Sequence, residues 1–222
     1  MKDHHILISF DLDFTLIDNT EGILNSFRYA FKKYHLPNLD DDTLKKTIGR
    51  PLEQVFKENT NLEPKILVKA FRDYYKNKGM FQVDLLDGVI QKLKVFRNTG
   101  ILLGIVTSKK QEIAIDLLKY LKIFQYFDFV IGETALIKKK TDKEVKQFFL
   151  SKYPHSSYII VGDHLTDRAL AEMLECPFIG VLTGNTTEDE LKNNATVPIF
   201  IFNHISELTK EDILFITDNI EK

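Results

Sequence analysis

Residues 6–13 read ILISFDLD, a short apolar run followed by the two aspartates Asp11 and Asp13. Isoleucine and phenylalanine favour strands, and an apolar run of this length that ends in polar residues is typical of a strand buried on both faces. Strands of that kind occur mainly in parallel sheets covered by helices. The segment therefore predicts the first strand of such a sheet, with two carboxylates at its carboxyl end.

Further apolar runs alternate with amphipathic segments along the chain. Strands are expected at 101–106, 129–131, 158–161, 178–181 and 199–201. Helical spacing of apolar residues predicts helices over 88–98, 111–122 and 166–175, the first of them capped by Asp87. This alternation predicts an α/β fold, a doubly wound, Rossmann-like parallel sheet.

Residues 18–83 depart from the alternation, because they contain several helical patterns and no convincing strand. One apolar stripe is formed by Leu24, Phe27 and Phe31 at helical spacing. We interpret 18–83 as an inserted helical cap domain and expect 1–17 and 84–222 to form the α/β core domain.

The overall composition is that of an ordinary globular protein, with 44% hydrophobic and 28% charged residues and a formal net charge of -2. That charge gives no reason to expect nucleic acid or a membrane as a partner. Cys176 is the only cysteine, and the chain shows no signal or transmembrane segment, so a cytoplasmic location is expected. The oligomeric state stays open, and a monomer is compatible with the sequence.

Polar side chains follow three of the expected strands, at the edge where open α/β sheets bind their ligands. These side chains belong to Asp11 and Asp13, Thr107 and Ser108, and Asp163 and Asp167. Several carboxylates in one crevice repel one another unless a cation lies among them, and Mg²⁺ prefers oxygen ligands from carboxylates and phosphates. The sequence therefore predicts a Mg²⁺ site.

Such a site suits phosphoryl transfer. A carboxylate beside Mg²⁺ can attack a phosphoryl group and form an acyl phosphate, and a second carboxylic acid can protonate the leaving oxygen. If the chain bends after Asp11, the backbone carbonyl of Asp13 can bind the metal instead of its side chain. The Thr107 hydroxyl and a lysine are suited to hold the phosphoryl oxygens.

Three motifs resemble those of the haloacid dehalogenase-like hydrolase superfamily, in the same order. They are FDLDFTL at 10–16, VTSK at 106–109 and VGDHLTD at 161–167. The helical insertion, with GRPLEQVF at 49–56, resembles the cap of the phosphoglycolate phosphatase and β-phosphoglucomutase branch. The resemblance spans nearly the whole chain.

The resemblance implies a role for each matching residue. Asp11 would be nucleophile and metal ligand, and Asp13 the general acid and base whose carbonyl binds Mg²⁺. Thr107, with Ser108 beside it, would bind the phosphoryl group. Asp163 would complete the metal site with Asp167 supporting it from behind. Arg50 in the cap would be a candidate contact to the substrate.

Two positions depart from the superfamily pattern. Phe14 stands where the superfamily usually has glycine. The lysine motif normally ends in proline, whereas Lys140 is followed by Thr141, and Lys140 matches best by its spacing to the next helix. Lys138 and Lys139 remain alternatives for the phosphate-binding lysine.

Each feature also has an ordinary structural explanation. Asp163 or Thr107 could cap a helix, Arg50 could be a surface residue, and His164 is interpreted as a loop residue. Taken together and in order, the motifs favour a Mg²⁺-dependent phosphatase that hydrolyses a small-molecule phosphate monoester through an aspartyl-phosphate on Asp11. The alternatives are a phosphotransferase like β-phosphoglucomutase and a non-catalytic binding protein on the same scaffold.

Overall fold

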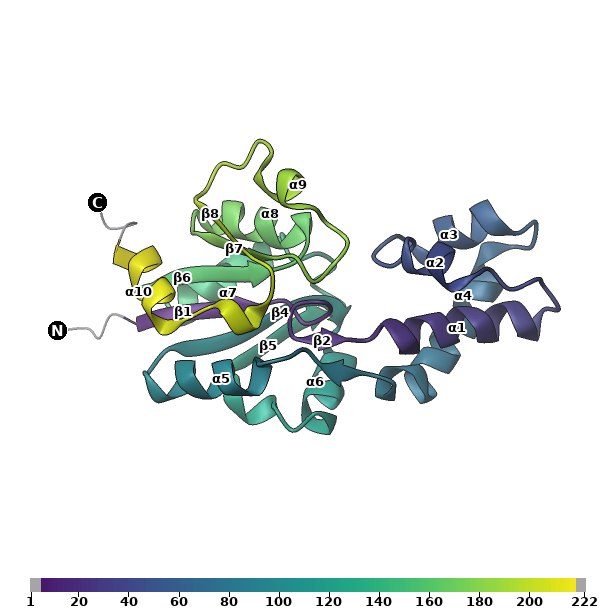
Figure 1. Cartoon of the computed structure of the whole chain (residues 1–222), viewed down its shortest axis with the longest axis horizontal. Helices are drawn as coiled ribbons and strands as arrows, with labels where there is room; N and C mark the ends of the chain where they lie inside the picture. Colours follow the sequence, from purple (N-terminus) through teal and green to yellow (C-terminus); the bar gives the residue numbers. More distant parts are fainter. Residues whose placement is uncertain (1–4, 219–222) are drawn as a thin grey trace. The chain divides into compact units, whose positions relative to one another are not determined.

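The computed structural model describes residues 5–218. Within these residues, six parallel strands form one sheet, drawn side by side in Figure 1. In sheet order they are β5 (Phe129–Glu133), β4 (Leu102–Lys110), β1 (His5–Phe10), β6 (Ser156–Gly162), β7 (Phe178–Val181) and β8 (Ile199–Phe202). The predicted α/β fold with a parallel sheet is confirmed.

The sheet is buried on both faces. Leu7 and Ile8 are consecutive residues of β1, so their side chains point to opposite faces, and both are fully buried. Leu7 belongs to a core cluster that includes Phe149 of α7 (Lys143–Lys152) and Leu170 of α8 (Leu165–Leu174). The continuous apolar runs of the sequence thus reflect strands covered on both sides.

The remaining elements of this unit connect the strands or follow the last of them. The helices are α5 (Val89–Asn98), α6 (Gln111–Tyr120), α9 (Glu188–Lys192) and α10 (Lys210–Asp218), with 3₁₀ turns η2 (Phe124–Tyr126) and η3 (Ile205–Glu207). The prediction that Asp87 caps α5 is wrong. Gly88 is the N-cap residue, at φ +79°, and no side-chain hydrogen bond within the described chain caps this helix. The helix begins one residue later than expected, so Asp87 precedes the cap position.

Strand β4 is longer than the apolar run that predicts it. The run ends at Val106, but the strand continues to Lys110, with a shift of its register against β5 after Val106. The shift is characteristic of a β-bulge, which changes the direction of side chains at a strand end. Thr107, Ser108 and Lys109 lie in this irregular stretch.

Residues Asp18–Asp84 form a second compact unit. Its helices are α1 (Thr20–Lys33), α2 (Asp41–Lys45), α3 (Leu52–Asn59) and α4 (Pro64–Asn77), followed by the 3₁₀ turn η1 (Gly79–Phe81). Phe27, Phe56 and Phe71 make edge or tilted ring contacts in its own core. Two short strands, β2 (Ile17–Asp18) and β3 (Asp84–Leu85), pair where the chain enters and leaves this unit.

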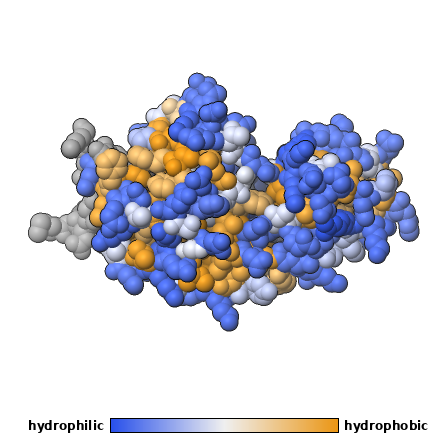
Figure 2. Space-filling view, viewed as in Figure 1, coloured by the Kyte–Doolittle hydropathy of each residue, from blue (hydrophilic) through white to orange (hydrophobic). Residues whose placement is uncertain are grey.

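Hydrophilic side chains cover most of the molecular face shown in Figure 2, with apolar side chains reaching the surface in places. Leu136 and Phe215 are among the exposed apolar residues. No helix formed by residues 5–218 has the length and apolar character needed to cross a membrane.

Candidate active site

The register of the central strands brings three chain segments together at the carboxyl edge of the sheet. Phe10 pairs with Ile105 on one side and with Val161 on the other. Asp11 is the first residue after Phe10, Thr107 is the second residue after Ile105, and Asp163 is the second after Val161. The Asp11 N–H donates to the Val161 carbonyl oxygen at 2.8 Å, which holds the end of β1 against β6.

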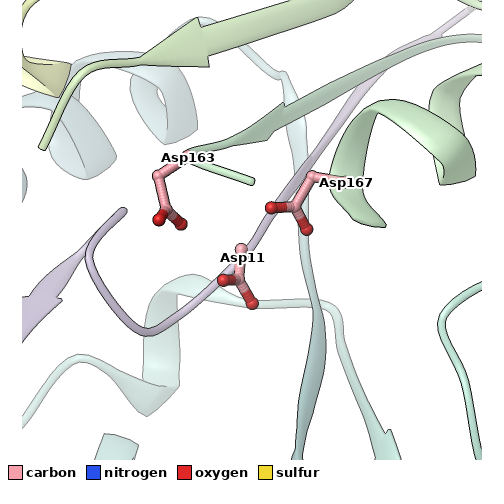
Figure 3. Close-up of side chains that lie close together, drawn as sticks. All are labelled: Asp11, Asp163 and Asp167. Carbon is pink, nitrogen blue, oxygen red and sulfur yellow. The ribbon is translucent and has the colours of Figure 1, made fainter. Parts of the chain in front are cut away.

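Three buried carboxyl groups meet at this edge. One oxygen each from Asp11, Asp163 and Asp167 lies within 4.8 Å of the others. Figure 3 shows the three carboxyl groups turned toward one another, from the ends of β1 and β6 and from the start of α8. This is the convergence that the sequence predicts for Asp11 and Asp163.

Lys140 supplies a positive charge to this cluster. Its Nζ atom lies 2.7 Å from Asp11 Oδ1 and 2.5 Å from Asp167 Oδ1, and its side chain is buried. Burial by itself lowers the pKa of a lysine, but the charges of Asp11 and Asp167 outweigh burial and raise the pKa of Lys140. Lys140 therefore stays positively charged next to Asp11.

The other two lysines of the run have different surroundings. Lys138 and Lys139 are exposed, and both of their backbone N–H groups donate to Asp142 Oδ2. Of the three candidates, Lys140 is the one that the structure brings to Asp11. Its role in binding phosphate stays a prediction.

The carboxyl groups of the cluster have high proton affinity. Burial, followed by the charges of Asp11 and Asp167, raises the pKa of Asp163 to about 8, with Lys140 opposing the shift. Burial also raises the pKa of Asp167, although Lys140 partly counteracts it. A divalent cation would favour the ionised form of each carboxyl group.

Asp167 is held in place by the start of α8. Its Oδ2 atom accepts a hydrogen bond from the His164 N–H at 3.1 Å, and the His164 ring accepts one from the Thr166 N–H at 3.2 Å. These bonds form a capping box, so His164 is the N-cap of α8 and not merely a loop residue. Capping leaves Asp167 Oδ1 directed at Lys140.

Asp13 lies apart from the carboxylate cluster. Its side chain is 27% exposed, and Oδ2 forms an ion pair with Lys109 Nζ at 3.2 Å. Burial, opposed by Lys109 and reinforced by Asp11, raises the pKa of Asp13. A raised pKa makes a carboxyl group easier to protonate, which suits a residue that acts as a general acid.

The remaining expected residues divide between the two units. Thr107 is buried, and its Oγ1 atom accepts a hydrogen bond from the Lys109 N–H at 3.2 Å, whereas Ser108 is exposed. Arg50 belongs to the helical unit, where its guanidinium donates to both oxygens of Glu58 at 2.7 Å. That pairing is what an ordinary surface residue would make.

Phe14 has a left-handed backbone, with φ at +58°. This conformation is strained for residues with a Cβ atom and is readily adopted by glycine. The left-handed backbone of the turn after Asp13 thus explains why the superfamily pattern has glycine at this position. The Thr183 hydroxyl donates to the Phe14 carbonyl oxygen and helps to hold the turn.

Three further residues at the site carried no assigned role in the sequence. Lys109 contacts Asp13, and Thr15 donates from its hydroxyl to Asp163 Oδ1 at 3.3 Å. Gly184 packs so closely against Asp163 that a Cβ atom there would lie 1.9 Å from Oδ2. Lys109 and Thr15 lie inside the quoted motifs, so the sequence could have indicated that they belong to the site. No motif indicated Gly184.

The fold and the site together define a class of α/β protein with an acidic, lysine-containing centre at the carboxyl edge of its parallel sheet. The donor set fits Mg²⁺, because the clustered groups are carboxylates and hard oxygen donors are what this ion binds. A site for zinc or copper would instead be rich in cysteine or histidine.

Comparison with known proteins identifies the family. The family model for haloacid dehalogenase-like hydrolases matches residues 8–181. The Dickeya dadantii protein named "Probable phosphatase IndB" is 30% identical over 214 residues, which is 91% of each chain. This chain belongs to the haloacid dehalogenase-like hydrolase family.

Two further relatives agree with this assignment. The phosphoglycolate phosphatase of Vibrio parahaemolyticus is 25% identical over 91% of this chain and 93% of its own length. The solved structure of the haloacid dehalogenase-like family hydrolase SP0104 from Streptococcus pneumoniae superposes with a TM-score of 0.79 at 28% identity, covering 90% of this chain and 94% of that one.

Proposed function

We propose that this protein is a Mg²⁺-dependent phosphatase that hydrolyses a small-molecule phosphate monoester through an aspartyl-phosphate on Asp11. The observation that carries the proposal is the cluster of Asp11, Asp163 and Asp167, with Lys140 Nζ 2.7 Å from Asp11 Oδ1. The names of two relatives, a phosphatase and a phosphoglycolate phosphatase, support the same reaction class.

The metal would be held by the carboxylates of Asp11 and Asp163, by the backbone carbonyl of Asp13 and by phosphate oxygens. Bound Mg²⁺ would neutralise negative charge on the carboxylates and on the phosphoryl group. Asp167 would support the site without being a ligand, since its oxygens already accept from Lys140 and from the His164 N–H.

In the first half of the reaction, an Asp11 oxygen attacks phosphorus and the bond from phosphorus to the ester oxygen breaks. Asp13 gives its proton to the leaving oxygen, as its raised pKa permits. The Thr107 hydroxyl and the Lys140 ammonium donate to phosphoryl oxygens. Lys140 also contacts Asp11 Oδ1 at 2.7 Å and so helps to hold the nucleophilic carboxyl group in place.

In the second half, Asp13 takes a proton from water, and the oxygen of that water attacks the phosphorus of the aspartyl-phosphate. The bond between phosphorus and the Asp11 oxygen breaks, which releases inorganic phosphate and restores Asp11. One carboxyl group thus serves as acid and then as base, which requires Asp13 not to be a nucleophile itself.

The test is phosphate release from p-nitrophenyl phosphate. We expect activity that requires Mg²⁺, that is lost with EDTA and that is abolished by Asp11→Asn. Asp116→Asn changes an exposed aspartate on α6 in the same way and serves as the matched control, with activity unchanged. Turnover by a folded Asp11→Asn protein would remove Asp11 from its proposed role.

A further inference from the structure

Lys109 is an unusual lysine for its place at a sheet edge. Its side chain is only 10% exposed, whereas the next residue, Lys110, is exposed. Lysines with so little of the side chain exposed usually have a paired ammonium group, and Lys109 Nζ is paired with Asp13 Oδ2 at 3.2 Å. The irregular end of β4 therefore fixes a positive charge beside one particular carboxyl group.

The position of Asp13 in the proposed reaction defines what Lys109 faces. A general acid must lie within hydrogen-bond distance of the ester oxygen that leaves. Lys109 Nζ is one hydrogen-bond distance from the Asp13 carboxyl oxygen, and that oxygen would be another from the leaving ester oxygen. The Lys109 ammonium would therefore lie within about 6 Å of the ester oxygen. The oxygens of a carboxylate one carbon beyond the ester oxygen, or of the second phosphate of a pyrophosphate, lie roughly 3 Å from that oxygen. An anionic group on the leaving side thus comes within reach of Lys109.

Neutralising the negative charge of the site carboxyl groups does not by itself explain why Lys109 lies beside Asp13. Lys140 already lies between the buried carboxyl groups of Asp11 and Asp167. Asp13 has more of its side chain exposed than either, and a partly hydrated carboxylate gains little from an ion pair. An ammonium group has three N–H donors, so it can contact Asp13 and a substrate anion at once.

We propose that Lys109 forms an anion-binding subsite for the leaving group. The enzyme would then prefer phosphate compounds with a carboxylate one carbon beyond the scissile oxygen, or a phosphate bonded to it, over esters of neutral alcohols. This inference depends on the proposed function, because it takes Asp13 to be the acid that protonates the leaving oxygen.

The test first compares two substrates of similar size. 2-Phosphoglycolate carries a carboxylate at the position where 2-hydroxyethyl phosphate carries a neutral hydroxymethyl group. We expect kcat/KM to favour phosphoglycolate at least about tenfold, a typical gain from one charge-assisted hydrogen bond. Lys109→Met keeps the length of the side chain and removes the charge, so it should abolish that preference, mainly by raising KM for phosphoglycolate. Because Lys109 also contacts the proposed acid Asp13, the variant should lower kcat/KM for both substrates, but by a much larger factor for phosphoglycolate than for 2-hydroxyethyl phosphate.

Two variants serve as controls. Lys110→Met removes the neighbouring exposed charge and should leave the preference unchanged. Lys109→Arg keeps a cation and should retain most of it. Pyrophosphate against methyl phosphate forms a second pair of substrates. If Lys109→Met affects one anionic substrate alone, that substrate identifies whether a carboxylate or a phosphate fits the subsite.

The outcomes separate the two proposals. The subsite proposal would be contradicted if the wild-type enzyme showed no preference for anionic substrates. It would also be contradicted if a folded Lys109→Met protein lost equal activity on charged and neutral substrates. Both results would leave the proposed phosphatase function standing. A protein that releases no phosphate from any of the four compounds with Mg²⁺ would contradict the proposed function itself. Thermal melting of each variant shows whether it is folded.

Discussion

Phe14 combines a large side chain with a left-handed backbone, immediately after the proposed acid Asp13. Residues with a Cβ atom lose about 1–2 kcal/mol in this conformation, which glycine does not. The turn persists because the Phe14 N–H donates to the Ile17 carbonyl oxygen at 2.8 Å and the Phe14 carbonyl accepts from Thr183. Local hydrogen bonds thus offset the strain of an unfavourable residue.

A pair of substitutions isolates this strain. Phe14→Gly and Phe14→Ala both remove the ring, but only glycine relieves the backbone. We expect the glycine variant to be more stable than the alanine variant by about 1 kcal/mol, after allowing for the greater flexibility of glycine in the unfolded chain. Thermal or urea unfolding of the two proteins measures the difference. An alanine variant of equal or greater stability would show that the turn is not strained.

At the level of elements, two glycines allow strand ends to approach the site carboxylates. A Cβ atom on Gly184, in the loop after β7, would lie 1.9 Å from Asp163 Oδ2. A Cβ atom on Gly162, at the end of β6, would lie 2.3 Å from Asp167 Cγ. Neither contact is possible, so a larger residue must displace the carboxyl group. The loops are therefore part of the geometry of the acidic cluster.

Gly184→Ala tests this directly. The terminal carboxylate of Asp163 can rotate more easily than the backbone can move, so we expect the fold to survive and Mg²⁺ affinity to fall at least about tenfold. Calorimetric titration with Mg²⁺ measures the change. Gly100→Ala is the control: Gly100 has φ at +81°, and a Cβ atom added there would meet no atom within 4 Å. That variant should lose stability and keep its Mg²⁺ affinity. Equal affinities for all three proteins would argue against the loop's role.

For the whole molecule, the site links stability to pH. The pKa of Asp163 is about 8 in the folded protein, against the ordinary value of 3.8 that is expected on unfolding. Between these values the folded state binds more protons than the unfolded state, so stability falls as pH rises, by at most about 1.4 kcal/mol per pH unit for one proton. The metal-free protein should therefore lose stability from about pH 5 to pH 8.

The contribution of Asp163 can be separated from that of other groups with Asp163→Asn, which remains neutral at every pH. In EDTA, the stability of this variant relative to the unaltered protein should rise between pH 5 and pH 8. Saturating Mg²⁺ should reduce the pH dependence of the unaltered protein, since the cation favours ionised carboxylates. Unfolding curves at several pH values provide the measurement. Parallel pH profiles for both proteins would rule out the Asp163 titration.

Short-range patterns in the sequence determined much of this structure. Apolar runs such as 6–10 and 178–181 identified the strands because burial on both faces leaves few polar positions, and the order of motifs identified the family, which the comparisons confirm. The aspartates at strand ends could be predicted for the same reason, because a charged residue directly after an apolar run marks the point where a buried strand ends. The assigned roles of these aspartates, and the bounds of a separate cap domain, remain predictions.

Only the tertiary structure decided which of three adjacent lysines reaches Asp11, that Lys109 faces Asp13, and that Gly184 makes room for Asp163. These facts depend on register, on the irregular end of β4 and on contacts between residues far apart in the chain. A sequence pattern records which residues are polar and where a strand ends, but the direction of a side chain beyond that end is set by its neighbours in space.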